Sequence, residues 1–262
     1  MSVPDMDIVA VIAAAGISSR LSPIPCSKEI LPIGTGHQGD GTRRPKVAIQ
    51  YLLESFRMAG ITKTYIVIRT NKWDIPAFLG NGNSEGMDIA YLLMGLPYGA
   101  AFSVNQSFPF TGSSIVAFGF PDIIIQPQNV YRTLAVKLRE ENADVVLGLF
   151  PATNPQKVDM IQFDGSNRIS RFVIKPGETE LHYTYLTALW TPVFSKFMND
   201  YLAGKCREID ADSDPDIHVG DVLQAFINEG NTIQYSKFEE GTYIDIGTVD
   251  DYSIAVMKYM QK

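Results

Sequence analysis

The sequence predicts an α/β protein with three layers, α/β/α, built around a mixed, mostly parallel central sheet. Three observations indicate this fold class. Residues 8–15 form a continuous apolar run, which is typical of a central strand covered on both faces. A helical pattern at 45–59 and a second buried strand at 64–68 follow, so a right-handed crossover should place the two strands in parallel. Asp164 and Gly165 lie between two apolar runs and predict a hairpin, which adds antiparallel strands.

The remaining elements of the first half are predicted from the same periodicities. Short apolar stretches bounded by glycine or proline predict strands, and apolar residues spaced three or four apart predict helices. We expect strands at 88–93, 100–104, 114–119 and 145–150, and an amphipathic helix at 129–142.

The second half contains both element types. We expect the hairpin strands at 159–163 and 168–174, further strands at 184–190, 232–238 and 243–246, and helices at 192–202, 220–228 and 249–260. No linker-like stretch separates the halves, so a single domain over 1–262 is expected. The polar, glycine-rich segment 34–44 predicts either an ordinary flexible turn or a hairpin that acts as a flap.

Composition argues against several classes of function. Of the 262 residues, 45% are hydrophobic and 19% are charged, which is the profile of an ordinary globular protein. The formal net charge of −7 argues against a broad nucleic-acid-binding surface. No apolar run is long enough to cross a membrane, and the first residues lack the pattern of a signal peptide. Two cysteines, Cys26 and Cys206, are too few for a disulfide framework, so we expect a cytoplasmic protein.

The most informative stretch follows the first strand. Ala14, Ala15 and Gly16 are small, so the backbone can approach a ligand closely and its N–H groups can surround phosphate oxygens. Arg20 adds a forked donor and Lys28 a compact positive charge, which together suit a triphosphate. The alternative is a tight turn with two solvated cations. The stretch is neither a Walker A motif nor a G-x-G-x-x-G fingerprint, which argues against a nicotinamide-dependent dehydrogenase.

Residues 14–20, followed by Lys28 and Pro32, resemble the signature loop of the sugar-phosphate nucleotidylyltransferases, also called NDP-sugar pyrophosphorylases. Five later segments fall in the order that this family shows. They are 44–61, 91–101, 118–122, Ile174-Lys175-Pro176 and 243–248. The resemblance therefore covers nearly the whole chain.

This resemblance implies a Rossmann-like nucleotide-diphospho-sugar transferase fold, similar to the glucose-1-phosphate thymidylyltransferases and uridylyltransferases. The implied activity transfers a nucleotidyl group from a nucleoside triphosphate to a sugar 1-phosphate and releases pyrophosphate. The N-terminal half would bind the nucleotide and the C-terminal half the phosphorylated acceptor. The implied cofactor is Mg²⁺, because two anionic substrates must be held together and hard oxygen ligands suit this ion.

The resemblance also implies roles for five charged residues. Asp122 and Asp245 would hold the magnesium ion. Each also follows a predicted apolar strand, so each can lie at the carboxyl end of the sheet; the alternative is a turn or helix-capping aspartate. Among the catalytic residues, Arg20 and Lys28 would bind the triphosphate and neutralise the departing pyrophosphate. Lys175 would bind the acceptor phosphate, with an ordinary surface lysine as the alternative.

Further residues are assigned to the two substrates by the same resemblance. The nucleotide-binding residues would be Ala14, Ala15, Gly16, Met94, Pro97 and Gly99, and the acceptor-binding residues Asp159, Lys175 and Thr187. Met94 replaces a glutamine that many members use to bind a pyrimidine, so the identity of the base is open. Asp159 and Ile174 replace a glycine and a glutamate near the acceptor. The acceptor could therefore be a polyol phosphate or a phosphocholine-like compound, and a nucleotide-binding regulatory protein without turnover is a third alternative. A homo-oligomer is compatible with each.

Overall fold

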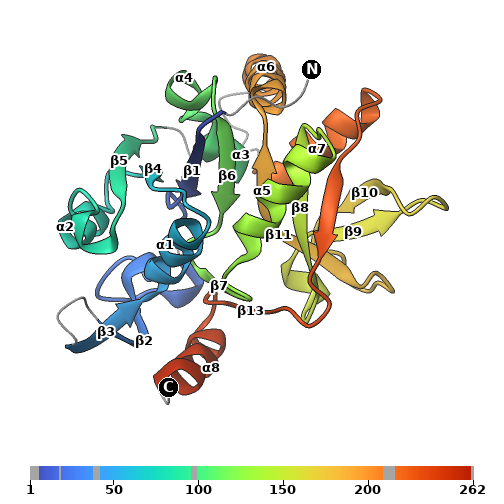
Figure 1. Ribbon diagram of the computed structural model, residues 1–262. Coiled ribbons are helices and arrows are strands. Elements are labelled where there is room, and N and C mark those ends of the chain that lie inside the picture. Colours follow the sequence, from blue (N-terminus) through green and yellow to red (C-terminus); the bar gives the residue numbers. More distant parts are fainter. Residues whose placement is uncertain (1–5, 18, 38–41, 96–98, 209–215, 261–262) are drawn as a thin grey trace.

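The computed structural model describes residues 6–17, 19–37, 42–95, 99–208 and 216–260. Figure 1 shows a central sheet with helices on both of its faces. The strands along this sheet are, in spatial order, β10 (Ile169–Val173), β9 (Met160–Phe163), β11 (Tyr183–Trp190), β6 (Ile115–Gly119), β1 (Ile8–Ala13), β4 (Lys63–Ile68) and β5 (Asp88–Leu93). In addition, β8 (Val145–Pro151) pairs with β11 and with β12 (Gln234–Lys237).

The sheet is mixed and mostly parallel. Strands β1, β4, β5, β6, β8, β9 and β12 run in one direction, and β10 and β11 oppose them. Two antiparallel pairs lie outside the main sheet: β2 (Pro32–His37) with β3 (Arg43–Val47), and β7 (Ile123–Gln126) with β13 (Thr242–Asp245). The predicted fold class, the parallel β1–β4 pair and the β9–β10 hairpin are confirmed.

The helices flank the sheet on both sides. The α-helices are α1 (Ala48–Met58), α2 (Asp74–Leu79), α3 (Ala100–Asn105), α4 (Phe108–Thr111), α5 (Val130–Glu140), α6 (Pro192–Glu208), α7 (Val219–Asn228) and α8 (Val249–Met260). The short 3-10 helices are η1 (Ser19–Leu21), η2 (Lys28–Ile30), η3 (Asn83–Glu85) and η4 (Pro155–Lys157). No helix in the described ranges combines the length and the apolar character needed to cross a membrane.

The apolar core forms two layers on opposite faces of the sheet. In β1, Ala10 and Ile12 pack in the layer that contains α1 and α5, whereas Val9 and Val11 pack in the layer that contains α3, α6 and α7. This alternation follows from the two-residue period of a strand, and both faces are apolar because both are covered. The apolar run at 8–15 is continuous because β1 is buried between helices on both of its faces.

Some expected elements differ from those in the structure. Residues 100–104 form the helix α3 rather than a strand, with Ala101, Phe102 and Val104 buried on one side. A short apolar run does not distinguish a buried strand from a buried helix, which is why the periodicity failed there. Residues 45–47 belong to β3, so the helix predicted from 45 begins at Ala48. The strand β7 and the helices α2 and α4 were not expected.

Candidate active site

The cavity that contains most of the predicted site residues lies at the carboxyl ends of β1, β4 and β6 and has a volume of about 480 Å³. Ala15 and Gly16 follow β1, Arg69 follows β4, and Asp122 follows β6. Ligands of open α/β sheets bind at this edge. Another hollow of about 500 Å³ lies at the opposite end of β1, beside Ile8, and contains none of the predicted site residues. The first cavity is therefore the candidate active site.

The small-residue loop is held against the neighbouring strand and opens into this cavity. The backbone N–H of Ala14 donates a hydrogen bond to the carbonyl oxygen of Val67 at 2.8 Å, and Ala14 is completely buried. At Gly16, no described atom outside the glycine and its two chain neighbours lies within 4 Å of the position that a Cβ would take. The loop thus presents backbone to open space, which is the arrangement that close approach of a phosphate group requires.

Lys28 and Asp122 both line the cavity and are in direct contact, although 94 positions separate them. Lys28 begins η2, and its Nζ forms an ion pair with the carboxylate of Asp122. Burial by itself lowers the pKa of Lys28, but the carboxylates of Asp122, Glu29 and Asp245 together raise that pKa above its usual value. The lysine is therefore a positive charge held inside the cavity.

Asp245 is placed beside Asp122 by the β7–β13 pair. It pairs with Ile123, and the backbone N–H of Ile246 donates a hydrogen bond to the carbonyl oxygen of Asp122 at 2.9 Å. Burial and the nearby carboxylate of Asp122 raise the pKa of Asp245 to about 6. The unpredicted strand β7 is thus the element that brings the two predicted metal ligands together.

Arg20 completes this group of charges. A Cβ built on Gly247 would lie 3.2 Å from the guanidinium of Arg20 and 3.1 Å from the carboxylate of Asp245. The positive charges of Lys28 and Arg20 partly oppose the rise in the pKa of Asp245. The structure therefore brings together Arg20, Lys28, Asp122 and Asp245, as the sequence predicted.

The donor set around these carboxylates is compatible with a magnesium ion. The described residues include no group of three or more His, Cys, Asp or Glu side chains that could enclose a metal. Asp122 and Asp245 are nevertheless close enough for one carboxylate to raise the pKa of the other. Magnesium usually takes one or two protein carboxylates and completes its shell with water and substrate phosphates. Two carboxylates at a phosphate-binding cavity fit that pattern.

Two of the predicted base-binding residues line the same cavity. Met94 is buried, and its sulfur accepts a hydrogen bond from the hydroxyl of Ser103 at 2.8 Å. Gly99 has a φ of 95°, and a Cβ there would lie 2.5 Å from the carbonyl oxygen of Ile217, so a side chain has no room. Pro97 lies outside the described residues.

The predicted acceptor residues Asp159, Lys175 and Thr187 do not line the 480 Å³ cavity. The hydroxyl of Tyr185 is hydrogen-bonded to Asp159. Burial raises the pKa of Asp159, and the positive charges of His218 and Lys175 offset part of this effect. Thr187 pairs with the last residue of β6, and its buried hydroxyl has no partner among the described residues. These residues lie apart because they come from the β9–β11 side of the sheet.

Reasoning from the sequence missed several residues that line the cavity. They are Glu29, Arg69, Phe120 and Asp216. Glu29 is 1% exposed; its Oε1 accepts a hydrogen bond from Nζ of Lys72 at 2.6 Å, and its Oε2 has no partner in the part of the chain that is described. In the sequence, the only hint that Glu29 lies at the site was its position next to Lys28. Its partner Lys72 is 43 positions away, so no local pattern could reveal their contact.

These features define a class of protein: an α/β fold in which a small-residue loop, two cations and two carboxylates meet at the carboxyl edge of the sheet. The model of the nucleotidyl transferase family matches residues 9–262. The chain therefore belongs to the nucleotidyl transferase family, which confirms the family indicated by its signature loop.

Curated relatives are similar over most of this chain. The low-salt glycan biosynthesis nucleotidyltransferase Agl11 of Haloferax volcanii is 23% identical over 244 residues, which cover 92% of this chain and 63% of Agl11. A glucose-1-phosphate thymidylyltransferase of Mycolicibacterium smegmatis is 24% identical over 246 residues, which cover 92% of this chain and 78% of that protein. The chain thus spans less than two thirds of the length of Agl11.

Solved structures share the fold. A provisionally assigned glucose-1-phosphate thymidylyltransferase of Bacillus anthracis superposes with a TM-score of 0.80 at 18% identity, covering 97% of this chain and 96% of that one. A UDP-glucose pyrophosphorylase in complex with UDP-glucose gives a TM-score of 0.76 at 18% identity, with coverages of 97% and 98%. The Rossmann-like fold expected from the sequence is thus the fold of this chain.

Proposed function

We propose that this protein is a magnesium-dependent nucleotidyltransferase that converts a nucleoside triphosphate and a sugar 1-phosphate into an NDP-sugar and pyrophosphate. The observation that carries the proposal is that Arg20, Lys28 and Asp122 line one cavity beside a small-residue loop, with Asp245 directly beside Asp122. Two anionic substrates meet in this reaction, so fixed cations must offset their repulsion.

The proposed transfer is an in-line displacement at phosphorus. An oxygen of the acceptor phosphate attacks the α-phosphorus of the triphosphate, the bond from that phosphorus to the bridging oxygen breaks, and pyrophosphate leaves with that oxygen. Arg20 and Lys28 bind the β- and γ-phosphates and stabilise the charge on the leaving pyrophosphate. No covalent enzyme intermediate is required, because the acceptor phosphate is already a nucleophile.

Asp122 and Asp245 are the residues that would hold magnesium. When bound, the ion supplies positive charge to the phosphate oxygens on which negative charge increases during transfer. The raised pKa of Asp245 supports this assignment, because two neighbouring buried carboxylates repel each other until a cation is present.

The two substrates are assigned to different sides of the site. The loop Ala14, Ala15 and Gly16 would bind the triphosphate, and Met94 and Gly99 the base. Asp159, Lys175 and Thr187 would bind the acceptor, with Lys175 on its phosphate. Support comes from the buried, unpartnered Oδ1 of Asp159 among the described atoms, because such a group is costly unless a ligand supplies its hydrogen bond.

A substrate screen tests the proposal. Purified protein is incubated with each common nucleoside triphosphate, a panel of phosphorylated acceptors and Mg²⁺, and pyrophosphate release is measured with and without EDTA. We expect release with one or a few triphosphates and a sugar 1-phosphate, and none in EDTA. Release with a polyol phosphate or phosphocholine instead identifies the alternative acceptor class. Nucleotide binding without release under any condition contradicts the enzyme function and favours a regulatory role.

A further inference from the structure

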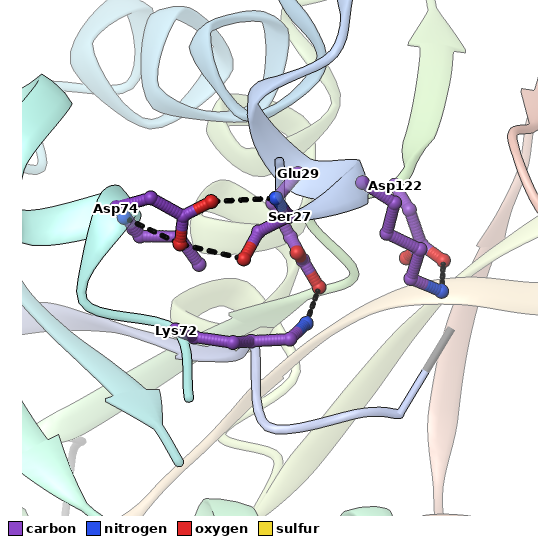
Figure 2. A network of polar contacts seen from close by, with 7 residues as sticks. Ser27, Glu29, Lys72, Asp74 and Asp122 are labelled. Atoms are coloured by element: carbon purple, nitrogen blue, oxygen red, sulfur yellow. Dashed lines mark hydrogen bonds and ion pairs between the residues drawn. The ribbon is translucent and has the colours of Figure 1, made fainter. Parts of the chain in front are cut away.

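The segment that carries Lys28 into the cavity is attached, on both sides of this residue, to the chain at the start of α2 (Figure 2). On one side, the carboxylate of Asp74 accepts hydrogen bonds from the backbone N–H and the hydroxyl of Ser27, at 2.6 and 2.7 Å. On the other side, Oε1 of Glu29 accepts a hydrogen bond from Nζ of Lys72 at 2.6 Å. Lys72 and Asp74, which are two positions apart, thus hold the residues on both sides of Lys28.

The ion pair between Lys72 and Glu29 is almost completely buried, with side chains 5% and 1% exposed. Removing two charges from water opposes their attraction, so a buried ion pair is weak evidence for a contribution to stability. Such pairs can instead specify one geometry among alternatives, because an unpaired charge in the interior is strongly unfavourable. The burial of this pair therefore indicates a role in fixing the geometry of the residues beside it.

The position of the anchors relative to the cavity separates them from the groups that would contact a nucleotide. Lys28 and Glu29 line the cavity, whereas Lys72 and Asp74 do not. The helix η2, which begins at Lys28, is only three residues long. A helix of this length has too few internal hydrogen bonds to hold its shape alone, so contacts from outside must fix it.

We propose that Lys72 and Asp74 are positioning residues that hold the flanks of Lys28, so that its ammonium group stays where the phosphates of the nucleotide bind. This inference rests on the proposed function, which assigns Lys28 to those phosphates. The ion pair of Lys28 with Asp122 cannot hold Lys28 in place by itself, because an incoming phosphate competes for the same ammonium group. Anchors that lie outside the cavity persist when the nucleotide binds.

The test compares Lys72→Met and Asp74→Ala with the matched control Asp144→Ala. The carboxylate of Asp144 accepts a hydrogen bond from the hydroxyl of Thr191 at 2.7 Å, as that of Asp74 does from Ser27. Asp144 directly precedes β8, which runs in the same direction as β6. The cavity lies at the carboxyl end of β6, so Asp144 lies at the opposite edge of the sheet. A fourth variant, Lys72→Arg, keeps the positive charge.

Three quantities are measured: hydrogen exchange of the backbone amides at 27–31, binding of inorganic tripolyphosphate with Mg²⁺, and the steady-state kinetics of pyrophosphate release. In Lys72→Met and Asp74→Ala we expect exchange at 27–31 to be faster by about tenfold or more. We expect kcat/KM for the triphosphate to fall on the order of 100-fold, because a displacement of about 1 Å costs that much. Tripolyphosphate binding should weaken, and Lys72→Arg should recover most of the turnover.

The control decides whether these losses reflect positioning or general destabilisation. Asp144→Ala should lower the unfolding midpoint but keep wild-type exchange at 27–31 and wild-type turnover. Wild-type exchange and turnover in both site variants, or equal losses in the control, would overturn the inference. If one site variant does not fold, the other decides, because the two act through different atoms. If folded wild-type protein releases no pyrophosphate, the proposed function is refuted. Hydrogen exchange at 27–31 and tripolyphosphate binding then decide the positioning role by themselves.

Discussion

At the scale of single residues, the pKa values of Lys28 and Asp245 are shifted by charges from other segments of the chain. Lys28 keeps a raised pKa because three carboxylates outweigh the effect of its burial. Asp245 has a pKa raised to about 6 because it is buried beside Asp122, although Arg20 and Lys28 oppose the shift. Removing one member therefore changes the protonation or position of the others, so single substitutions should have large effects.

The proposed magnesium ligands give the first prediction. Asp122→Asn or Asp245→Asn keeps the shape of the side chain but removes a negative oxygen, so we expect magnesium-dependent turnover to fall by at least about 100-fold. The measurement is pyrophosphate release across a Mg²⁺ titration, with circular dichroism to check the fold. The matched control is Asp200→Asn, because Asp200 also pairs with a lysine but lies exposed on α6. Wild-type turnover in both site variants would remove the metal assignment.

Asp159 gives a prediction about stability and pH. Burial raises its pKa in the folded protein above the ordinary value of 3.8, with part of the shift offset by His218 and Lys175. The contribution of this group to stability is therefore fully present below the unfolded pKa and is lost as the pH rises through the folded pKa. Asp159→Asn cannot ionise, so it should exceed the wild type in stability near pH 8 and lose this advantage as the pH falls towards about 4.

Urea unfolding midpoints of the two proteins across this pH range check the prediction about Asp159. A difference in midpoint that does not change with pH would contradict it. The proposed acceptor role adds a second readout, because Asp159→Asn should raise the KM for the acceptor more than the KM for the triphosphate. The buried carboxylate would then cost stability at neutral pH and serve substrate binding.

At the scale of elements, short segments that do not belong to the main sheet position much of the cavity. The β7–β13 pair places Asp245 beside Asp122. The start of α3 places Gly99 against the chain that leads into α7, where the N–H of Ala101 also donates a hydrogen bond to the carbonyl oxygen of Ile217 at 3.2 Å. The hairpin β2–β3 packs on α8, and its Gly34 lies against the hydroxyl of Tyr51.

The start of α3 gives a prediction about Gly99. Gly99→Ala should destabilise the protein by about 1–3 kcal/mol, because φ is 95° and the new Cβ would meet the backbone of Ile217. It should also weaken nucleotide binding, because the same turn lines the cavity. Thermal unfolding and nucleotide titration measure the two effects. Gly165→Ala is the control, since its Cβ would meet no described atom within 4 Å, and equal behaviour of the two variants would contradict the prediction.

Most elements were predictable from the sequence because their apolar periodicity was long or bounded by clear turn residues. The strand β1 and the helix α5 are examples. The helix α3 was not predictable, because six residues of mixed small and apolar character fit either a strand or a helix until packing against α6 and α7 decides. The strand β7 has four residues, and its partner β13 is more than a hundred positions away, so no local signal identified it.

At the scale of the whole molecule, the halves share one sheet and two apolar layers. The strand β6 of the first half pairs with β11 of the second half, and both core layers contain side chains from each. Contacts of this kind couple the halves, since separating them would expose apolar surface on both. The single domain over 1–262 remains a prediction that unfolding measurements test.

Cooperative unfolding is the expected behaviour of a single domain. In the variant Trp73→Phe, fluorescence reports on Trp190, which is buried in the second half. We expect the urea transition followed by this fluorescence to coincide with the transition followed by far-UV circular dichroism, which averages over all helices and strands. Transitions with different midpoints would mean that the halves unfold separately and that two domains are present.

By itself, the sequence indicated most of the elements and the candidate charges. The apolar run at 8–15 indicated a strand covered on both faces. Arg20 and Lys28 stood out beside a small-residue loop, and the family resemblance indicated Asp122 and Asp245, each of which follows a predicted strand. The inferences about the elements succeeded because they depend on local periodicity, and the candidate charges were chosen from residue chemistry and the family resemblance. Local periodicity and residue chemistry are both present in a short stretch of chain, whatever surrounds it.

Only the tertiary structure decided which side chains contact each other directly. It paired Lys28 with Asp122, Glu29 with Lys72 and Ser27 with Asp74, and it separated the acceptor residues from the cavity. Each of these contacts joins positions more than 40 apart, so it depends on which strands become neighbours in the sheet. The order of the strands depends on which apolar surfaces are buried over the whole chain, so it cannot be predicted from a local sequence pattern.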